Sequence, residues 1–219
     1  LEFTRTYFPK LFYFEGEWHY RNDGSYELGT AEGGRKIFLM GMNYLNEYKD
    51  SREALNTYYL KTIHHEFTHI LHQTVEFSTA YQFITTDYKV DKCFNREFAD
   101  FLSRGFITDY AQKNYHEDFA EMVSTYVTNT EEEWEALLKK ASYAPKKDKD
   151  GNLVYDANGS VIADTTTKAN GRDLIEQKLS IMRSYMQDQW GIDIDELRAS
   201  ILQRENDVVN GKVDLKNLD

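Results

Sequence analysis

The stretch His65-Glu66-Phe67-Thr68-His69 has the HExxH spacing of zinc hydrolases. In a helix, His65 and His69 lie one turn apart on the same face, so that two imidazole nitrogens can reach one zinc ion. Glu66 lies at the flank of that face, where it can take a proton from a water molecule held by the metal. The pattern also arises by chance in a helix that is rich in histidine. The rest of the chain therefore has to supply the helix, a third ligand and a cleft.

Residues 51 to 76 predict the helix. No Gly or Pro interrupts them, and Asp50 and Ser51 are candidates for the N-cap. Apolar residues recur every three or four positions, at Leu55, Tyr59, Ile63, Phe67, Ile70, Leu71 and Val75. The motif thus lies inside one long helix whose apolar side is roughly opposite the two histidines.

Two further histidines flank the motif. His72 continues the face of His65 and His69, but it lies about 10.5 Å from His65 along the axis at ~1.5 Å per residue. Three side chains spread over that length cannot converge on one ion unless the helix breaks. We therefore expect His72 to be a polar neighbour of the ligands, and His64, which points away from their face, to be structural.

A short apolar run, Lys36 to Gly41, follows the breaker pair Gly33-Gly34 and predicts a strand just ahead of the helix. Such a strand could present an open edge to an extended peptide and bind it through main-chain hydrogen bonds. It could equally be a plain core strand, and the sequence does not decide between the two.

A second helix is predicted over residues 115 to 127, with Asn114 as its N-cap. Glu117 and Glu121 lie one turn apart on it and repel each other unless something positive lies near them. A solvated acidic face explains the pair by itself. Together with the HExxH motif, however, this helix offers the carboxylate of a His₂Glu catalytic zinc site, which leaves one position open for water.

These two segments resemble known proteins. The strings His65–Gln73 and Glu117–Met122 are similar to those of the zinc-binding metallopeptidase lipoproteins of Bacteroidetes, which are often encoded beside outer-membrane nutrient-import systems. The arrangement also resembles the gluzincin site of the anthrax lethal factor type. The resemblance implies that His65, His69 and Glu117 bind Zn²⁺ and that Glu66 is the general base.

The same resemblance assigns further roles. Tyr110 stands seven residues before Glu117, where the lethal-factor type has a tyrosine that assists at the oxyanion. Glu121 would not bind the metal itself but would orient one of the ligand histidines. The family implies an extracytoplasmic lipoprotein of the outer membrane, facing periplasm or cell surface, with an import complex as partner. The chain lacks the lipid-attachment cysteine at its start, as a trimmed product would.

The composition sets the class of protein. The 219 residues, 41% of them hydrophobic and 15% aromatic, predict a globular fold with a proper core. A net charge of −11 argues against nucleic acid as a partner, because phosphate binding needs a basic surface. The single cysteine, Cys93, cannot form an internal disulfide and is expected in or near the core.

We expect the C-terminal third to have a structural role. Thr130 and Glu133 form a capping box at the start of a helix that ends near Ser142. We expect three regions, namely a catalytic domain over 1–142, an exposed hairpin over 143–171, and a helical pair over 172–219 packed on the same domain. Calcium binding by the hairpin is not expected, because its register lacks the required bidentate Glu.

The sequence therefore predicts a zincin-like α+β domain, mainly α-helical, with a small sheet before the active-site helix. The favoured function is zinc-dependent hydrolysis of peptide bonds in a peptide or protein substrate. Glu66 would act as general base, and Tyr110 would stabilise the oxyanion. The first alternative is a zinc-bearing binding or processing component of a nutrient-import system with little peptidase activity. The second is a metal-free structural domain.

Overall fold

The computed structural model describes residues 11–213 of the chain. Its residues group into two compact units that each combine segments far apart in the chain. Unit 1 contains the described parts of Leu1–Glu76 and Met186–Asp219 together with Val123–Thr128, and unit 2 contains Phe77–Met122 and Asn129–Tyr185. The division expected from the sequence, at residues 142 and 171, follows chain order and stays a prediction.

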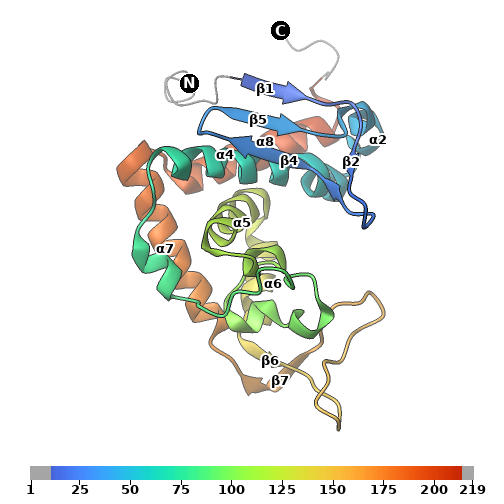
Figure 1. Ribbon diagram of the computed structural model, residues 1–219, viewed down its shortest axis with the longest axis vertical. Coiled ribbons are helices and arrows are strands. Elements are labelled where there is room, and N and C mark those ends of the chain that lie inside the picture. The colour runs from blue at the N-terminus through green and yellow to red at the C-terminus, as the bar shows by residue number, and fades with distance from the viewer. Residues whose placement is uncertain (1–10, 214–219) are drawn as a thin grey trace. The chain divides into compact units, whose positions relative to one another are not determined.

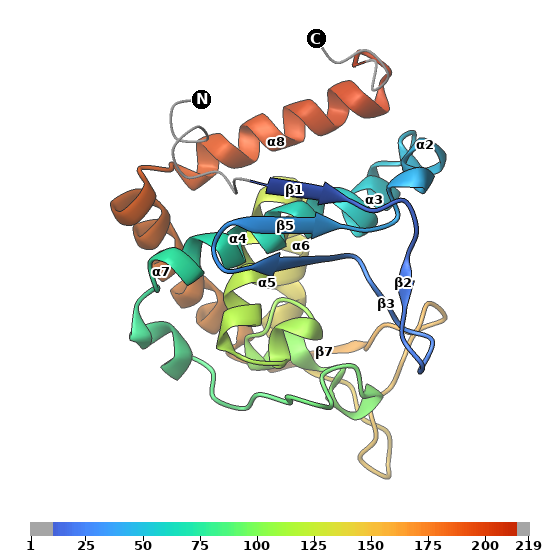
Figure 2. The same ribbon diagram turned by 45° about the horizontal axis from the view of Figure 1, so that its top comes forward.

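Unit 1 contains a small sheet whose order in the described residues is β1-β5-β4 (Figure 2). The strand β1 (Leu11–Phe14) runs parallel to β5 (Lys36–Leu39), and β4 (Gly29–Glu32) runs antiparallel to β5. A separate short pair joins β2 (His19–Tyr20) to β3 (Tyr26–Glu27). The predicted strand at Lys36 is confirmed. The suggestion that it forms an open edge is wrong, because β5 is hydrogen-bonded on both sides.

The long helix predicted over residues 51 to 76 is present as one continuous run of helical turns. It consists of α3 (Arg52–Leu55), a π-helical turn (Asn56–Leu60) and α4 (Lys61–Thr74). The Ser51 hydroxyl accepts a hydrogen bond from the Ala54 amide and caps the run, as predicted. The HExxH motif lies in the middle of α4, beyond the π-helical turn.

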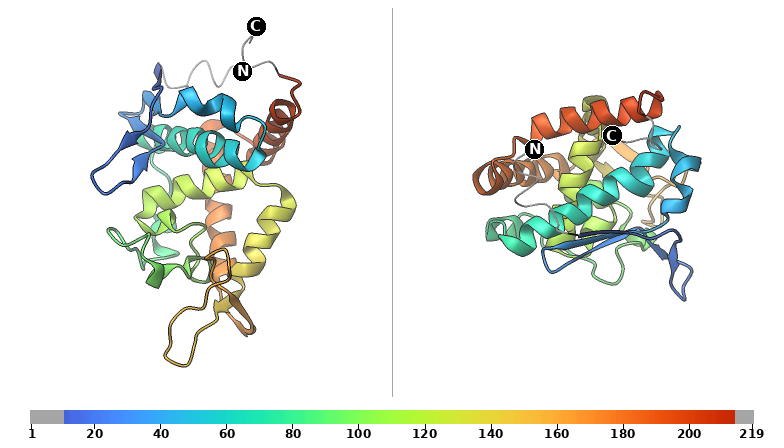
Figure 3. Two further views of the ribbon diagram at one scale, coloured as in Figure 1. Left: turned by 90° about the vertical axis from the view of Figure 1, so that its right-hand side faces the viewer. Right: turned by 90° about the horizontal axis from the view of Figure 1, so that it is seen from above.

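The core of this part of unit 1 lies between α4 and the sheet. Ile37 and Leu39 of β5 and Ile70 of α4 are almost completely buried. Half-buried apolar residues pack around them: Phe12, Ala31, Met42, Ile63 and Phe67. The right-hand view of Figure 3 shows α4 running along one face of the sheet. This packing presents the opposite side of α4, with its histidines, away from the sheet.

The second predicted helix is α5 (Tyr115–Thr128), whose residues up to Met122 belong to unit 2 and the rest to unit 1. The Asn114 side chain caps it, as predicted. The next helix, α6 (Glu131–Ala141), begins with the predicted capping box, in which Thr130 and Glu133 exchange hydrogen bonds.

Unit 2 also holds the hairpin and most of α7 (Gly171–Trp190). The paired strands are β6 (Tyr143–Pro145) and β7 (Ala163–Lys168), and the segment between them carries two tight turns (Figure 3). Around α5, the Phe77 and Phe119 rings stack with centroids 4.0 Å apart. The remaining short helical turns of the described chain are η1 (Met42–Tyr44), α2 (Leu45–Tyr48), η3 (Thr79–Phe83), η4 (Arg96–Phe98), η5 (Phe101–Arg104) and η6 (Tyr110–Gln112).

The last helix is α8 (Ile194–Val209), which is labelled in Figure 1. It belongs to unit 1. Gly191, with φ of +64°, ends α7 in a left-handed conformation that favours glycine. Arg52 of α3 donates to the buried Glu205 carboxylate of α8 at 3.0 Å and so ties these helices together. In the described part of the chain, every helix is too short or too polar to cross a bilayer.

Candidate metal centre

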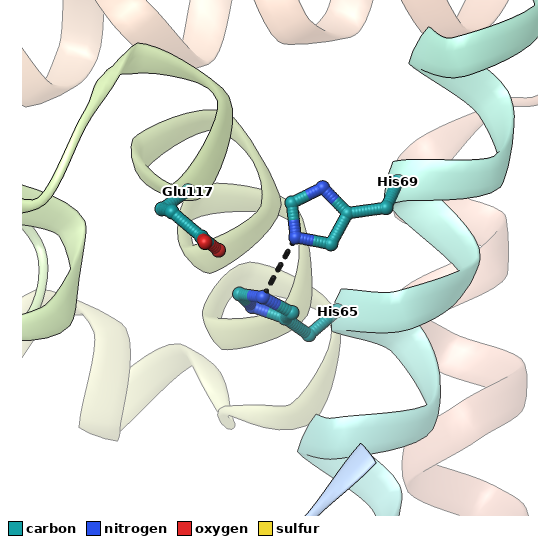
Figure 4. A group of neighbouring side chains, drawn as sticks. All are labelled: His65, His69 and Glu117. Carbon is teal, nitrogen blue, oxygen red and sulfur yellow. Dashed lines mark hydrogen bonds between the residues drawn. The ribbon is translucent and has the colours of Figure 1, made fainter. Parts of the chain in front are cut away.

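The helix α4 brings the two histidines of the motif together. The Nε2 atoms of His65 and His69 lie 3.0 Å apart, and both rings leave the same side of the helix (Figure 4). His65 is buried and His69 is half-buried. Two nitrogens bound to one tetrahedral zinc at ~2.0–2.1 Å are about 3.3 Å apart. The pair therefore needs only a small rotation of its rings to accept a zinc ion.

His72 contacts the motif as a neighbour. Its Nε2 lies 2.7 Å from Nδ1 of His69, so one imidazole donates to the other. This bond occupies Nδ1 of His69 and directs Nε2 towards His65. Such a partner at the far nitrogen of a ligating imidazole sets its tautomer and orientation. His72 thus contacts one of the proposed ligands, and its role beside the metal stays a prediction.

Glu66 lies where α4 packs against Gly29 of β4. Its side chain is buried, and a Cβ atom at Gly29 of β4 would lie 3.0 Å from Glu66 Cγ and 2.8 Å from Thr62 Cγ2. The strand can approach the helix this closely because position 29 carries no side chain. Gly29 thus shapes the space around the carboxylate expected to move the proton.

Glu117 lies in the first turn of α5. The Asn114 side chain accepts hydrogen bonds from the His116 and Glu117 amides, each at 3.0 Å. The Glu117 carboxylate accepts from the Tyr110 hydroxyl at 3.1 Å and from Lys113 Nζ at 3.0 Å. The side chain is 13% exposed. Both donors bond the same oxygen, Oε1, and so fix the orientation of the carboxylate.

Tyr110 and Lys113 form a small polar group with Glu117. Lys113 Nζ donates to the Tyr110 hydroxyl at 2.8 Å and lies 4.8 Å from the centre of its ring. Burial, with the Glu117 charge beside it, raises the pKa of Tyr110 to about 12, so the hydroxyl keeps its proton at neutral pH. Burial lowers the pKa of Lys113, but its bonds to Tyr110 and Glu117 outweigh this and raise the pKa overall.

Lys113 was not predicted as a neighbour of Glu117. It precedes the Asn114 cap and so lies outside α5, where the four-residue spacing of a helix does not apply. Thr108 was also missed, and its hydroxyl donates to the Glu121 carboxylate at 2.7 Å. Glu121 is buried. Its expected role in orienting a ligand histidine stays a prediction.

His64 lies apart from these groups on the back of α4. It lines an apolar cleft of about 380 Å³ in unit 1 with residues such as Ile63, Ile201 and Val208. Burial lowers the pKa of His64 to about 4, so it is neutral at physiological pH. The structural role expected of His64 stays a prediction. Cys93 is buried, as expected.

The donor chemistry suits a metal ion. His65 and His69 of unit 1 offer two imidazoles, and Glu117 of unit 2 offers one carboxylate (Figure 4). These donor types are those of His₂Glu catalytic zinc sites. His72 and Glu76 of unit 1 and His116 of unit 2 offer the same donor types, and His72 is already bonded to His69.

Two comparisons connect these observations to known proteins. A family model described as "Putative zinc-binding metallo-peptidase" matches residues 1–195. The crystal structure of a putative zinc-binding metallo-peptidase from Bacteroides caccae ATCC 43185 is 32% identical, with a TM-score of 0.70, and the match covers 100% of this chain and 72% of that one. The expected mainly helical α+β fold is thereby confirmed. A search of curated proteins finds no match.

Proposed function

Because the chain belongs to the zinc-binding metallo-peptidase family, we propose that it hydrolyses peptide bonds with a zinc ion held by its HExxH helix. The observation that carries the proposal is the His65–His69 pair, whose Nε2 atoms lie 3.0 Å apart on one face of α4. Glu66, the next residue after His65, is buried against β4. Hydrolysis by an HExxH motif requires two histidines on one face of a helix to bind zinc and the adjacent glutamate to act as general base.

The proposed third ligand is Glu117. Its carboxylate already accepts charge-assisted hydrogen bonds, and the metal would replace part of that positive environment. Zinc in such a site polarises the scissile carbonyl and lowers the pKa of a water molecule. The assignment follows from the likeness of Glu117–Glu121 to the second motif of gluzincins of the lethal-factor type.

The chain's own residues would then move the proton and bind the developing charge. Glu66 takes a proton from the attacking water and delivers it to the leaving amine. Tyr110, protonated at neutral pH, donates its hydroxyl hydrogen to the oxyanion of the tetrahedral intermediate. Lys113 supports this role, because its ammonium group donates to the same hydroxyl oxygen and holds it in place.

The peptide substrate would bind along β4. In the described residues, β4 pairs with β5 on one side only, so its other edge has no strand partner and would pair with an extended peptide. The strand also lies against α4 at Glu66. A peptide added there would run past the proposed general base, so β4 and not the strand at residues 36–41 would bind the substrate.

The likeness to lipoproteins encoded beside import systems supports an extracytoplasmic location, at the outer membrane and in contact with an import complex. Fractionation of cells that express the full-length protein tests the location. Recovery in the cytosol would contradict it.

The test of the function is Glu66→Gln. The variant should bind zinc as the wild type does but cleave peptides at least about 10²-fold more slowly, because only the general base is lost. Glu53→Gln, which neutralises an exposed carboxylate on α3, is the matched control and should keep full activity. Zinc-loaded wild type that cleaves nothing in a broad peptide library would reject the peptidase and favour a zinc-bearing binding component.

The ligand set is tested separately by anomalous scattering at the zinc edge in crystals of the holoprotein. We expect density bonded to His65, His69 and Glu117. Density bonded to His72 or Glu121 in place of Glu117 would contradict the assignment.

A further inference from the structure

Unit 2 contains a pair of opposite charges that is completely buried. Lys178 of α7 and Asp118 of α5 each have 0% exposed side chains, and Lys178 Nζ donates to Asp118 Oδ2 at 2.6 Å. Removing two charges from water is costly, and a well-packed apolar pair of the same size often stabilises a fold as well or better. Stability alone therefore does not account for the pair.

The position of the pair suggests another role. Asp118 directly follows Glu117 in the first turn of α5. The same ammonium group of Lys178 also donates to the Gly105 carbonyl at 2.7 Å. Gly105 ends the turn from which the chain leads to Tyr110. One lysine thus holds both segments that carry the candidate site residues of unit 2.

The surroundings leave little freedom to this lysine. Its Nζ lies 4.5 Å from the centre of the Phe106 ring and 5.7 Å from that of Tyr81. The Tyr88 hydroxyl donates to the same Asp118 oxygen at 3.1 Å. A buried network of this kind is rigid when its members are bonded, because each alternative position leaves a charge without a partner.

We propose that Lys178, through Asp118 and the Gly105 carbonyl, is a positioning residue that holds Glu117 and Tyr110 in the geometry needed for metal binding and catalysis. The inference rests on the proposed function, since it takes Glu117 as a zinc ligand. Removal of a residue that orients a metal ligand commonly lowers the affinity of the protein for the metal 10- to 100-fold. Lys178 would be such a residue, supplied by a helix far along the chain.

The experiment uses the double variant D118N/K178M in the full chain. Asn and Met match the size of the residues they replace and leave no unpaired charge, so the variant is expected to fold where the single K178M would leave Asp118 alone. We expect its zinc affinity, measured by competition with a chromophoric chelator, to be 10- to 100-fold below that of the wild type, with its urea unfolding midpoint little changed.

The same pair of substitutions is then introduced into E117A. If Lys178 acts through Glu117, D118N/K178M causes no further loss of zinc affinity in that background. The control is R52M/E205Q, which neutralises an ion pair in unit 1 whose arginine also donates to the Thr128 carbonyl at the far end of α5. This control is expected to leave zinc affinity unchanged.

Three outcomes would overturn the inference. Wild-type zinc affinity in D118N/K178M would show that the pair is only structural. An equal loss of affinity in the wild-type and E117A backgrounds would show that the pair acts on the whole fold. If E117A itself left zinc affinity unchanged, the ligand assignment in the proposed function would fail, and this inference would fail with it.

Discussion

The tautomers of three neighbouring histidines determine what the HExxH helix can bind. His69 is bonded through Nδ1 to His72 and faces His65 through Nε2. Since each neutral imidazole has one donor and one acceptor nitrogen, a proton of His69 on Nδ1 makes its Nε2 an acceptor, to which Nε2–H of His65 can donate. When the proton of His65 lies on Nδ1 instead, both facing Nε2 atoms carry a lone pair that a metal ion can bind. The tautomer of His65 therefore decides whether the pair forms a hydrogen bond or can bind a metal ion.

The hydroxyl of Tyr110 can be tested by a single substitution. Tyr110→Phe removes the donor to Glu117 and, in the proposed mechanism, to the oxyanion. We expect kcat to fall about 10²- to 10³-fold while zinc affinity changes less than about 3-fold, because the lost bond matters most in the transition state. Steady-state kinetics and a zinc titration measure the two effects.

Tyr155→Phe is the control for this substitution, because it also removes a hydroxyl that donates a hydrogen bond, here to the Arg96 carbonyl. It should leave kcat unchanged. A Tyr110→Phe enzyme with normal kcat would remove Tyr110 from the mechanism.

His64 makes stability depend on pH. The pKa of His64 in the folded protein is about 4, below the ordinary value of 6.5. Between these two pH values the unfolded chain is protonated at His64 and the folded chain is not. The stabilisation is complete above about pH 6.5 and is lost as the pH falls towards 4. We expect metal-free wild type to lose about 1–2 kcal/mol more than His64→Leu between pH 7 and pH 5, measured by urea unfolding.

Ile201→Leu serves as the control, because it changes an apolar residue of the same cleft and no titratable group. Its pH dependence should match that of the wild type. Equal pH dependence in His64→Leu and wild type would show that His64 is not buried in its neutral form.

At the scale of elements, the packing of α4 against β4 sets the space at Glu66, the proposed general base. At Gly29 an added Cβ would lie within 3.0 Å of two α4 side chains. Helix and strand cannot separate there without disturbing the core between α4 and β5, which Ile37, Leu39 and Ile70 fill. The glycine is needed for this contact and not for an unusual backbone conformation.

Gly29→Ala tests this contact. The added methyl group must push Thr62 Cγ2 and Glu66 Cγ aside, which should destabilise the protein by about 1–3 kcal/mol and lower kcat. Adding Thr62→Ser removes the nearer methyl group and should restore much of the stability. Urea unfolding and peptide hydrolysis provide the readouts. If Thr62→Ser did not relieve the effect, the clash at Gly29 would not be its cause.

Local sequence patterns predicted several elements correctly. The caps at Ser51, Asn114 and Thr130 are present because a short polar side chain before a helix satisfies amides only two or three residues away. The position of β5 in its sheet was not predictable in this way. Strand order depends on pairing with β1 and β4, which a pattern within residues 36–41 does not contain.

At the scale of the whole molecule, two helices belong to both compact units. The helices α5 and α7 each begin in unit 2 and end in unit 1, so the chain crosses from one unit to the other along helical backbone. Each unit also has its own buried acidic residue paired with a base, Glu205 with Arg52 and Asp118 with Lys178. The two residues of each pair lie far apart in the sequence.

Zinc should stabilise the whole protein. A ligand that binds only the folded state at about 1,000 times its Kd adds about 4 kcal/mol, which corresponds to a rise in Tm of about 10 °C for a chain of this size. We expect that shift on adding zinc to EDTA-treated protein, and a clearly smaller one in Glu117→Ala. Scanning calorimetry measures both. A Tm that does not respond to zinc would contradict the metal centre.

The sequence by itself determined the HExxH helix, its caps, the second helix with Glu117 and the family likeness. These features depend on spacings of a few residues, which helical geometry converts directly into shared faces. Only the tertiary structure placed β4 and Gly29 against Glu66, bonded Lys178 to Asp118 beside Glu117, and paired β5 on both sides. Those contacts join residues far apart in the chain, and their energies come from burial and pairing that no local pattern encodes. The HExxH helix therefore follows from its own residues, whereas its surroundings follow from the fold.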